Sequence, residues 1–140
     1  MMKSNSFSST QIAKATPSQL WSLYQDVENW NIWDTELEWS KLNGEFKDGT
    51  EGQLKSKGSP EVKFVLTDVE ELKKFTTYAN IPLGKLVIEH HIIEQDHNVE
   101  FTHVVYFTGP LSFVFDLILG RTFRKALPNV LVNIKNLLEV

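Results

Sequence analysis

Two histidines are the residues of this sequence best suited to acid–base chemistry. His90 and His103 lie in neighbouring segments whose apolar and polar residues alternate as in β-strands. If the turn between these segments centres on Asp96 and His97, the two imidazoles face each other across a hairpin. An imidazole titrates near neutral pH, so the pair could hydrogen-bond the carbonyl or hydroxyl group of a ligand, or act as catalytic acid and base. Alternatively, the histidines satisfy each other or the backbone inside a packed interior.

The pairing of the histidines also brings apolar residues together on one face of the hairpin. The predicted apolar pairs are Leu86 with Phe107, Ile88 with Val105, and Ile92 with Phe101. Because a register slip of one residue would turn every side chain to the opposite face, this agreement supports the pairing. We therefore expect both histidines on the inner, apolar face of a sheet.

A second hairpin, predicted around Glu71 and Leu72, extends this inner face with Phe75. It aligns apolar residues of its two strands, namely Val62, Phe64 and Leu66 with Ile81, Ala79 and Thr77. Further turns are indicated by Asn43-Gly44, Asp48-Gly49 and Gly58-Ser59-Pro60. Short strands at this spacing predict an antiparallel sheet. On an earlier strand Trp39 alternates with Leu37, so we expect its ring to point inward.

A helix is predicted to begin at Thr16. Thr16 can cap it, Pro17 suits its first turn, and Gln19 occupies the position that a capping box requires. Its apolar face consists of Leu20, Leu23, Tyr24 and Val27. Trp30 and Trp33 follow where this helix should already have ended. The two indole rings either line the mouth of a cavity or cap the core between helix and sheet.

A second, longer helix is predicted from Pro110 to the C-terminus. Its first apolar stripe consists of Leu111, Phe115, Ile118, Leu119 and Thr122, and its second of Phe123, Leu127, Val130, Ile134 and Leu137. Pro128 removes a backbone donor and predicts a kink, and Gly120 allows a close approach to another element. A basic cluster on this helix forms either an anion site or a solvated polar face; its members are Arg121, Arg124 and Lys125.

Length and composition favour one domain over residues 1–140, because 140 residues with 41% hydrophobic content can bury a sizeable core. The formal net charge of −4 gives no electrostatic reason to bind nucleic acid or an anionic membrane surface. The polar stretch Met1–Thr10 predicts no signal peptide, and no transmembrane segment is expected. A cytoplasmic location and a monomer or homodimer are the corresponding expectations.

Several kinds of chemistry have no signal in this sequence. The chain has no cysteine, so disulfides, thiolate metal sites and cysteine nucleophiles are excluded. Zinc requires three or four protein ligands, and the face that carries His90 and His103 offers no third donor. Phosphate-binding loops, nucleophile elbows and metalloprotease motifs are also missing from the sequence. We therefore expect no metal and no cofactor.

The order of these features resembles the polyketide cyclase/dehydrase family of the START-like superfamily. The resemblance runs from about Phe7 to Leu138 and is carried by Ala15-Thr16-Pro17, Leu20-Trp21, Asp26-Val27-Glu28-Asn29-Trp30, Trp33-Asp34, Thr102-His103 and Gly109-Pro110-Leu111. It implies an α+β helix-grip fold, in which a curved antiparallel sheet of about six or seven strands wraps around a long, kinked C-terminal helix. Two short helices would follow the first strand, and an apolar ligand cavity would lie between sheet and helix.

The resemblance gives the inward side chains a candidate role as the wall of that cavity. The expected ligand-binding residues are Trp33, Trp39, Phe64, Phe75, Thr77, His90, His103, Val105, Phe115 and Phe123. Only His90 and His103 are candidates for catalysis. In a packed domain the phenylalanines Phe115 and Phe123 would instead be core.

Two functions of different class follow. In the first, the protein binds or transports a hydrophobic small molecule, such as a lipid, a quinone-like or a polycyclic compound, in the cavity. In the alternative, it is a cyclase/dehydrase-type enzyme that uses a cavity histidine for proton transfer. A protein-interaction module is a third possibility, for which the sequence offers no specific surface.

Overall fold

The computed structural model describes residues 6–140. Residues 1–5, half of the stretch from which the lack of a signal peptide is predicted, lie outside the described part. Along the chain the elements are β1 (Phe7–Ala13), α1 (Pro17–Gln25), the 3-10 helix η1 (Val27–Ile32), β2 (Leu37–Leu42), β3 (Glu51–Ser56), β4 (Glu61–Glu70), β5 (Lys74–Ile81), β6 (Gly84–Gln95), β7 (Asn98–Phe107) and α2 (Ser112–Leu138).

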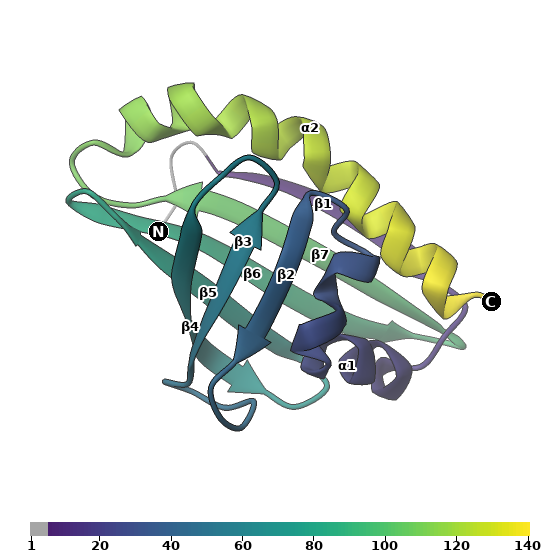
Figure 1. The fold of residues 1–140 in the computed structure, drawn as a ribbon. Helices are drawn as coiled ribbons and strands as arrows, with labels where there is room; N and C mark the ends of the chain where they lie inside the picture. Colours follow the sequence, from purple (N-terminus) through teal and green to yellow (C-terminus); the bar gives the residue numbers. More distant parts are fainter. Residues whose placement is uncertain (1–5) are drawn as a thin grey trace.

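The strands form one seven-stranded antiparallel sheet in the order β1-β7-β6-β5-β4-β3-β2. The sheet curves around the interior, and α2 lies across it, packed against β1 and β7 (Figure 1). The two short helices α1 and η1 connect the two edge strands β1 and β2 and lie beside the C-terminal end of α2. The predicted helix-grip fold is confirmed.

The predicted register of the last hairpin is confirmed residue by residue. His90 pairs with His103 as expected. The three predicted apolar pairs also form, namely Leu86 with Phe107, Ile88 with Val105 and Ile92 with Phe101. In the preceding hairpin Leu66 pairs with Thr77, also as predicted, but the ladder shifts between Thr67 and Glu70. This bulge lets β4 bend near its end without turning the inner face of the sheet over.

The start of α1 has the predicted capping box. The Thr16 side chain accepts a hydrogen bond from the backbone N–H of Gln19 at 3.2 Å, and the Gln19 side chain accepts one from the Thr16 N–H at 2.8 Å. Two further bonds fix the segment that follows. The Trp30 indole donates to the Tyr24 carbonyl at 2.8 Å, and the Ser40 hydroxyl of β2 donates to the Val27 carbonyl at 2.6 Å.

The inward orientation expected for Trp39 is wrong. Trp39 is 36% exposed, whereas Ser40 is buried. The pairing of β2 with β3 shifts between Leu37 and Trp39, so the simple alternation on which the prediction rested does not continue past Leu37.

The predicted stripes of α2 need a similar correction. In the first stripe Leu111, Ile118 and Leu119 are exposed, because the sheet covers only one side of this part of the helix. In the second stripe Leu127 and Ile134 are buried as expected, whereas Leu137 is exposed. Pro128 lies inside the continuous helix, and Gly120 is buried.

Within residues 6–140, no helix is long and apolar enough to cross a membrane. The cytoplasmic location and the oligomeric state expected from the sequence stay predictions.

Two glycines in turns test how closely the ends of the strands are packed. Gly58 and Gly109 both have positive φ, +75° and +97°. A Cβ on Gly58 would meet no atom, but one on Gly109 would collide with the Leu83 carbonyl oxygen. We expect Gly58→Ala to lower the free energy of unfolding by about 1 kcal/mol through backbone strain alone. Gly109→Ala should cost about 3 kcal/mol or more, since the two turns must also move apart. Urea denaturation measures both, and equal losses would contradict the tight contact.

Candidate functional site

The predicted histidine pair lies at the centre of the interior, together with a tyrosine that sequence reasoning did not assign to it. Tyr24 of α1 places its hydroxyl 2.8 Å from Nε2 of His103, and all three side chains, with His90, are buried. The ring centroids of His90 and His103 are 4.4 Å apart. The signal for Tyr24 was its place on the inward stripe of α1, because a buried phenol usually finds a polar partner.

The tautomer of His90 follows from its backbone contact. Its Nδ1 lies 3.2 Å from the carbonyl oxygen of Phe75, and a carbonyl only accepts, so Nδ1 carries the proton. The Nε2 atom of a neutral His90 is then a hydrogen-bond acceptor. The Phe75 ring lies flat on the His90 ring, with centroids 4.0 Å apart and an interplanar angle of 6°. His90 therefore has a fixed position and a fixed tautomer.

All three groups are neutral at physiological pH. Burial lowers the pKa of His103 to about 3, and the nearby His91 contributes in the same direction. Burial also lowers the pKa of His90 well below its usual value, repulsion from His103 adds to this, and the Phe75 hydrogen bond partly opposes it. For Tyr24, burial raises the pKa above its usual value. The cluster consequently offers hydrogen-bonding groups rather than charges.

Aromatic rings surround this cluster and fill the space around it. Tyr24 lies edge-on to Phe75 and Trp33 at centroid distances of 5.0 and 6.1 Å. Trp30 stacks on Phe64 at 5.6 Å, and Trp33 lies edge-on to His103 at 6.3 Å. Trp30 and Trp33 thus belong to the core, one of the two positions considered for them.

Most of the expected cavity wall is packed interior. The predicted ligand-binding residues that are buried are Trp33, Phe64, Phe75, Thr77, His90, His103 and Val105. Two hollows of about 440 and 210 Å³ are formed at the surface, one beside Leu72 and Ile93, the other beside Gln25 and Phe46. None of the predicted ligand-binding residues lines either hollow. The end of the grip that holds the histidines is therefore closed.

Toward the N-terminal half of α2, the inner face of β4, β5 and β6 becomes progressively exposed, whereas Phe107 at the same end of β7 stays buried. Along β4, Phe64 is 3% exposed, whereas Val62, two residues away on the same face, is 37% exposed. Along β5 and β6, buried Phe75 and His90 give way to half-buried Ala79 and Leu86. We call the half-covered apolar residues at this end the open inner surface; they are Leu54, Val62, Ala79, Leu86, Ile88 and Phe123.

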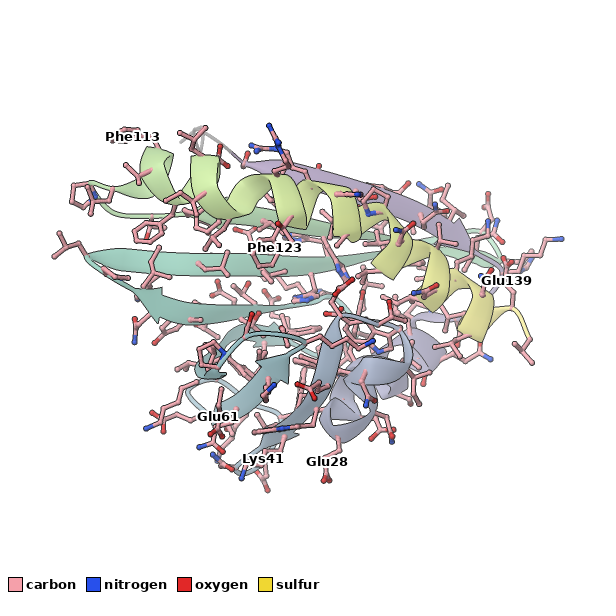
Figure 2. The ribbon with its side chains drawn as sticks, turned by 45° about the horizontal axis from the view of Figure 1, so that its top comes forward. Glu28, Lys41, Glu61, Phe113, Phe123 and Glu139 are labelled. Atoms are coloured by element: carbon pink, nitrogen blue, oxygen red, sulfur yellow. The ribbon has the colours of Figure 1, made fainter. Side chains whose placement is uncertain are left out.

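Phe123 is the contribution of α2 to this surface. Its ring lies edge-on to that of Phe107 with centroids 6.4 Å apart, and Figure 2 shows it between the helix and the sheet. Phe115, also predicted to line the cavity, is half-buried and is not packed against the core. Of the ten predicted ligand-binding residues, Phe123 is thus the one that belongs to the open inner surface.

Two buried donors have no partner. The indole nitrogens of Trp21 and Trp33 are buried and make no hydrogen bond within residues 6–140. Unpaired buried donors are rare in native proteins, because each costs about 1–3 kcal/mol of lost solvation. An acceptor atom within hydrogen-bond distance of either indole nitrogen would satisfy that donor.

No metal centre is formed by the described residues, since no three His, Cys, Asp or Glu side chains gather closely enough to hold an ion. Within residues 6–140, Tyr24 is the further polar side chain that hydrogen-bonds to the histidine pair. A phenol with a raised pKa is a poor metal ligand because it must lose its proton to bind.

Comparisons with known proteins agree with this architecture. A family model described as "Polyketide cyclase / dehydrase and lipid transport" matches residues 4–139. The chain belongs to this family. The resemblance from which the fold was predicted is thereby confirmed. A comparison with curated proteins gives no match.

Solved structures share the fold of this family member at low sequence identity. A START superfamily protein from Mycobacterium smegmatis is 13% identical with a TM-score of 0.72, covering 95% of this chain and 96% of its own. A hypothetical protein from Helicobacter pylori is 12% identical with a TM-score of 0.77, covering 98% and 89%. Ara h 8.0201 is 11% identical with a TM-score of 0.65, covering 92% and 96%. Identities at this level show the fold alone.

The buried histidines give this family member a specific dependence of stability on pH. In the unfolded chain a histidine binds a proton below about pH 6.5, whereas His103 in the fold does so only near pH 3. Between these values the unfolded state binds more protons. The contribution of His103 to the free energy of unfolding is therefore complete above about pH 6.5 and decreases as the pH falls. We expect His103→Gln to reduce the slope of unfolding free energy against pH by about 1.4 kcal/mol per pH unit between pH 6 and 4.

Urea denaturation of both proteins at several pH values between 7.5 and 4 measures these slopes. Glutamine keeps an acceptor for the Tyr24 hydroxyl but does not titrate. Carboxyl groups contribute equally to both proteins and cancel in the difference. Parallel slopes would mean that His103 is not buried in its neutral form.

Proposed function

We propose that this protein binds a hydrophobic small molecule on the open inner surface, between the sheet and the N-terminal half of α2. The observation that carries the proposal is the gradient of exposure along the inner face, from 3% at Phe64 to 37% at Val62. At one end of the concave sheet the apolar side chains are buried, and at the other end they are only half-covered. Binding of an apolar molecule at the half-covered end removes this apolar surface from water and is therefore favourable.

The chemistry at the closed end indicates which ligands would fit. An apolar body would contact Leu86, Ile88 and Phe123, which offer no polar atoms. A polar end group directed inward would lie toward the closed end, whose buried side chains Tyr24, His90 and His103 are neutral. Neutral surroundings favour a carbonyl or hydroxyl over a charged end group, because a buried charge without a partner is costly. Lipids, quinone-like and polycyclic compounds meet this description.

The alternative function, a cyclase/dehydrase-type enzyme, requires a histidine that accepts a proton. A group with a pKa of about 3 is protonated in roughly one molecule in ten thousand at pH 7, so His103 is a weak base. His90, also neutral, is held by the Phe75 carbonyl and stacked on its ring. These environments favour binding and orientation of a carbonyl group over proton transfer. The family description names both activities, and proton transfer by either histidine stays a prediction.

Neighbouring residues of β4 provide a matched test of the binding site. Val62 lies on the inner face and Lys63 on the outer face of the same strand, and both are exposed enough to accept a larger side chain. We expect Nile red, a neutral apolar dye, to bind the wild-type protein saturably. Val62→Trp fills the open inner surface and should weaken this binding by about tenfold or more, roughly 1.4 kcal/mol. Lys63→Trp adds the same ring elsewhere and should leave the affinity unchanged.

Fluorescence titration measures the affinities, and native mass spectrometry with organic extraction identifies any molecule that copurifies. A stoichiometric apolar adduct should be present in the wild type and depleted in Val62→Trp. If both tryptophan variants bind the dye as the wild type does, the open inner surface is not the binding site.

A further inference from the structure

The first turns of α2 carry mostly apolar side chains, on the side exposed to solvent as well as on the side that faces the sheet. From Leu111 to Leu119 the polar residues are Ser112 and Asp116. The side of this segment that faces the sheet is covered, and the buried Gly120 follows the segment in the chain. The outer side is exposed to solvent. Apolar side chains exposed there are Phe113 at 63%, Leu117 at 80% and Ile118 at 64%. A helical segment with so few polar residues is normally buried on most of its sides. The exposed apolar side chains of this segment therefore mark a candidate interaction surface.

A turn of the sheet adds a further exposed leucine at the same end of the molecule. Leu83, between β5 and β6, is 73% exposed and has a φ of +61°. Its carbonyl oxygen lies against Gly109, in the loop that leads into α2. Figure 1 shows this turn and the start of α2 at one end of the molecule, and Figure 2 shows Phe113 pointing away from the sheet. We name Leu83, Phe113, Leu117 and Ile118 the apical patch.

Positive charge borders the apical patch, although the chain as a whole is acidic. Between residues 109 and 125 the charged groups are Arg121, Arg124 and Lys125 against Asp116, a net charge of +2. The whole chain carries −4, so the remaining residues carry −6. Asp116 is bonded to Arg124 at 2.9 Å, which leaves Arg121 and Lys125 exposed beside the apolar residues. The sequence-based argument against anionic membranes used the charge of the whole chain and missed this separation.

We propose that the apical patch docks on the surface of an anionic lipid membrane. Phe113, Leu117 and Leu83 would enter the boundary between head groups and acyl chains, and Arg121 and Lys125 would contact the lipid phosphates. An apolar helical segment with basic residues beside it is the combination that binds such interfaces. The proposal concerns the outer side of α2 and does not depend on a ligand at the open inner surface.

A second copy of the chain fits the patch less well. A two-fold contact is built from the same patch of both copies, so it would bring Arg121 and Lys125 of both copies into one interface. Asp116 could not balance them, because it is already bonded to Arg124. An anionic lipid surface satisfies the apolar and the basic residues together.

Sedimentation of the full chain with lipid vesicles tests the proposal. We expect binding to vesicles of phosphatidylcholine with phosphatidylglycerol at 3:1, and much weaker binding to phosphatidylcholine alone. The double substitution Phe113→Ser with Leu117→Ser should lower the partition coefficient by about tenfold or more. Arg121→Glu with Lys125→Glu should lower it by a similar factor, and the wild-type binding should weaken as salt rises.

A matched control comes from exposed isoleucines elsewhere on the surface. Ile32 and Ile93 are exposed and lie outside the apical patch, so Ile32→Ser with Ile93→Ser should bind vesicles as the wild type does. Circular dichroism with urea denaturation checks that every variant is folded. The Val62→Trp variant should also bind vesicles normally, which separates this proposal from the proposed ligand site.

Three results would overturn the proposal. In the first, the folded wild type does not sediment with anionic vesicles. In the second, serine at Phe113 and Leu117 has no more effect than serine at the control positions. In the third, sedimentation velocity shows a dimer that the Phe113 and Leu117 substitutions dissociate, which would mean that a second copy covers the patch.

Discussion

The hydrogen bond between Tyr24 and His103 joins the first helix to the last strand across the interior and holds the two elements together at the closed end of the grip. Both groups are buried, so loss of this bond would leave a polar atom without its partner. Once α1 is held against β7, the rings of Trp33 and Phe75 pack around the bond and fill the concave face there. The histidines that look catalytic in the sequence are consequently part of a neutral, packed wall.

At the open end of the grip, α2 is the helix that covers the inner face of the sheet. The C-terminal half of α2 buries Leu127, Leu131 and Ile134, whereas its N-terminal half covers the sheet incompletely. The same shortage of cover explains two features on opposite sides of this half. Toward the sheet it leaves Val62 and Leu86 half-covered, and toward the solvent it leaves Phe113 and Leu117 bare. We propose a different apolar occupant for each side, a small molecule inside and a lipid surface outside.

Much of the fold was predictable because its signals are local or follow from one pairing. The capping box of Thr16 and Gln19 depends on residues three apart, and it forms as expected. The pairing of His90 with His103 follows from the alternation of apolar residues on two adjacent strands with a short turn, where only one register matches apolar to apolar. Family resemblance then supplied the order of the elements, which the family match and the related structures confirm.

The candidate site was less predictable because it depends on contacts between distant elements. The sequence by itself determined that His90 and His103 share an apolar face, since strand alternation is a property of the backbone. Only the tertiary structure decided that Tyr24 meets His103, that a shifted ladder turns Trp39 outward, and that the first stripe of α2 is exposed. Each of these depends on where a helix or a neighbouring strand lies in space. Periodicity specifies which residues share a face, but whether that face is covered is set by the packing of elements far apart in the chain.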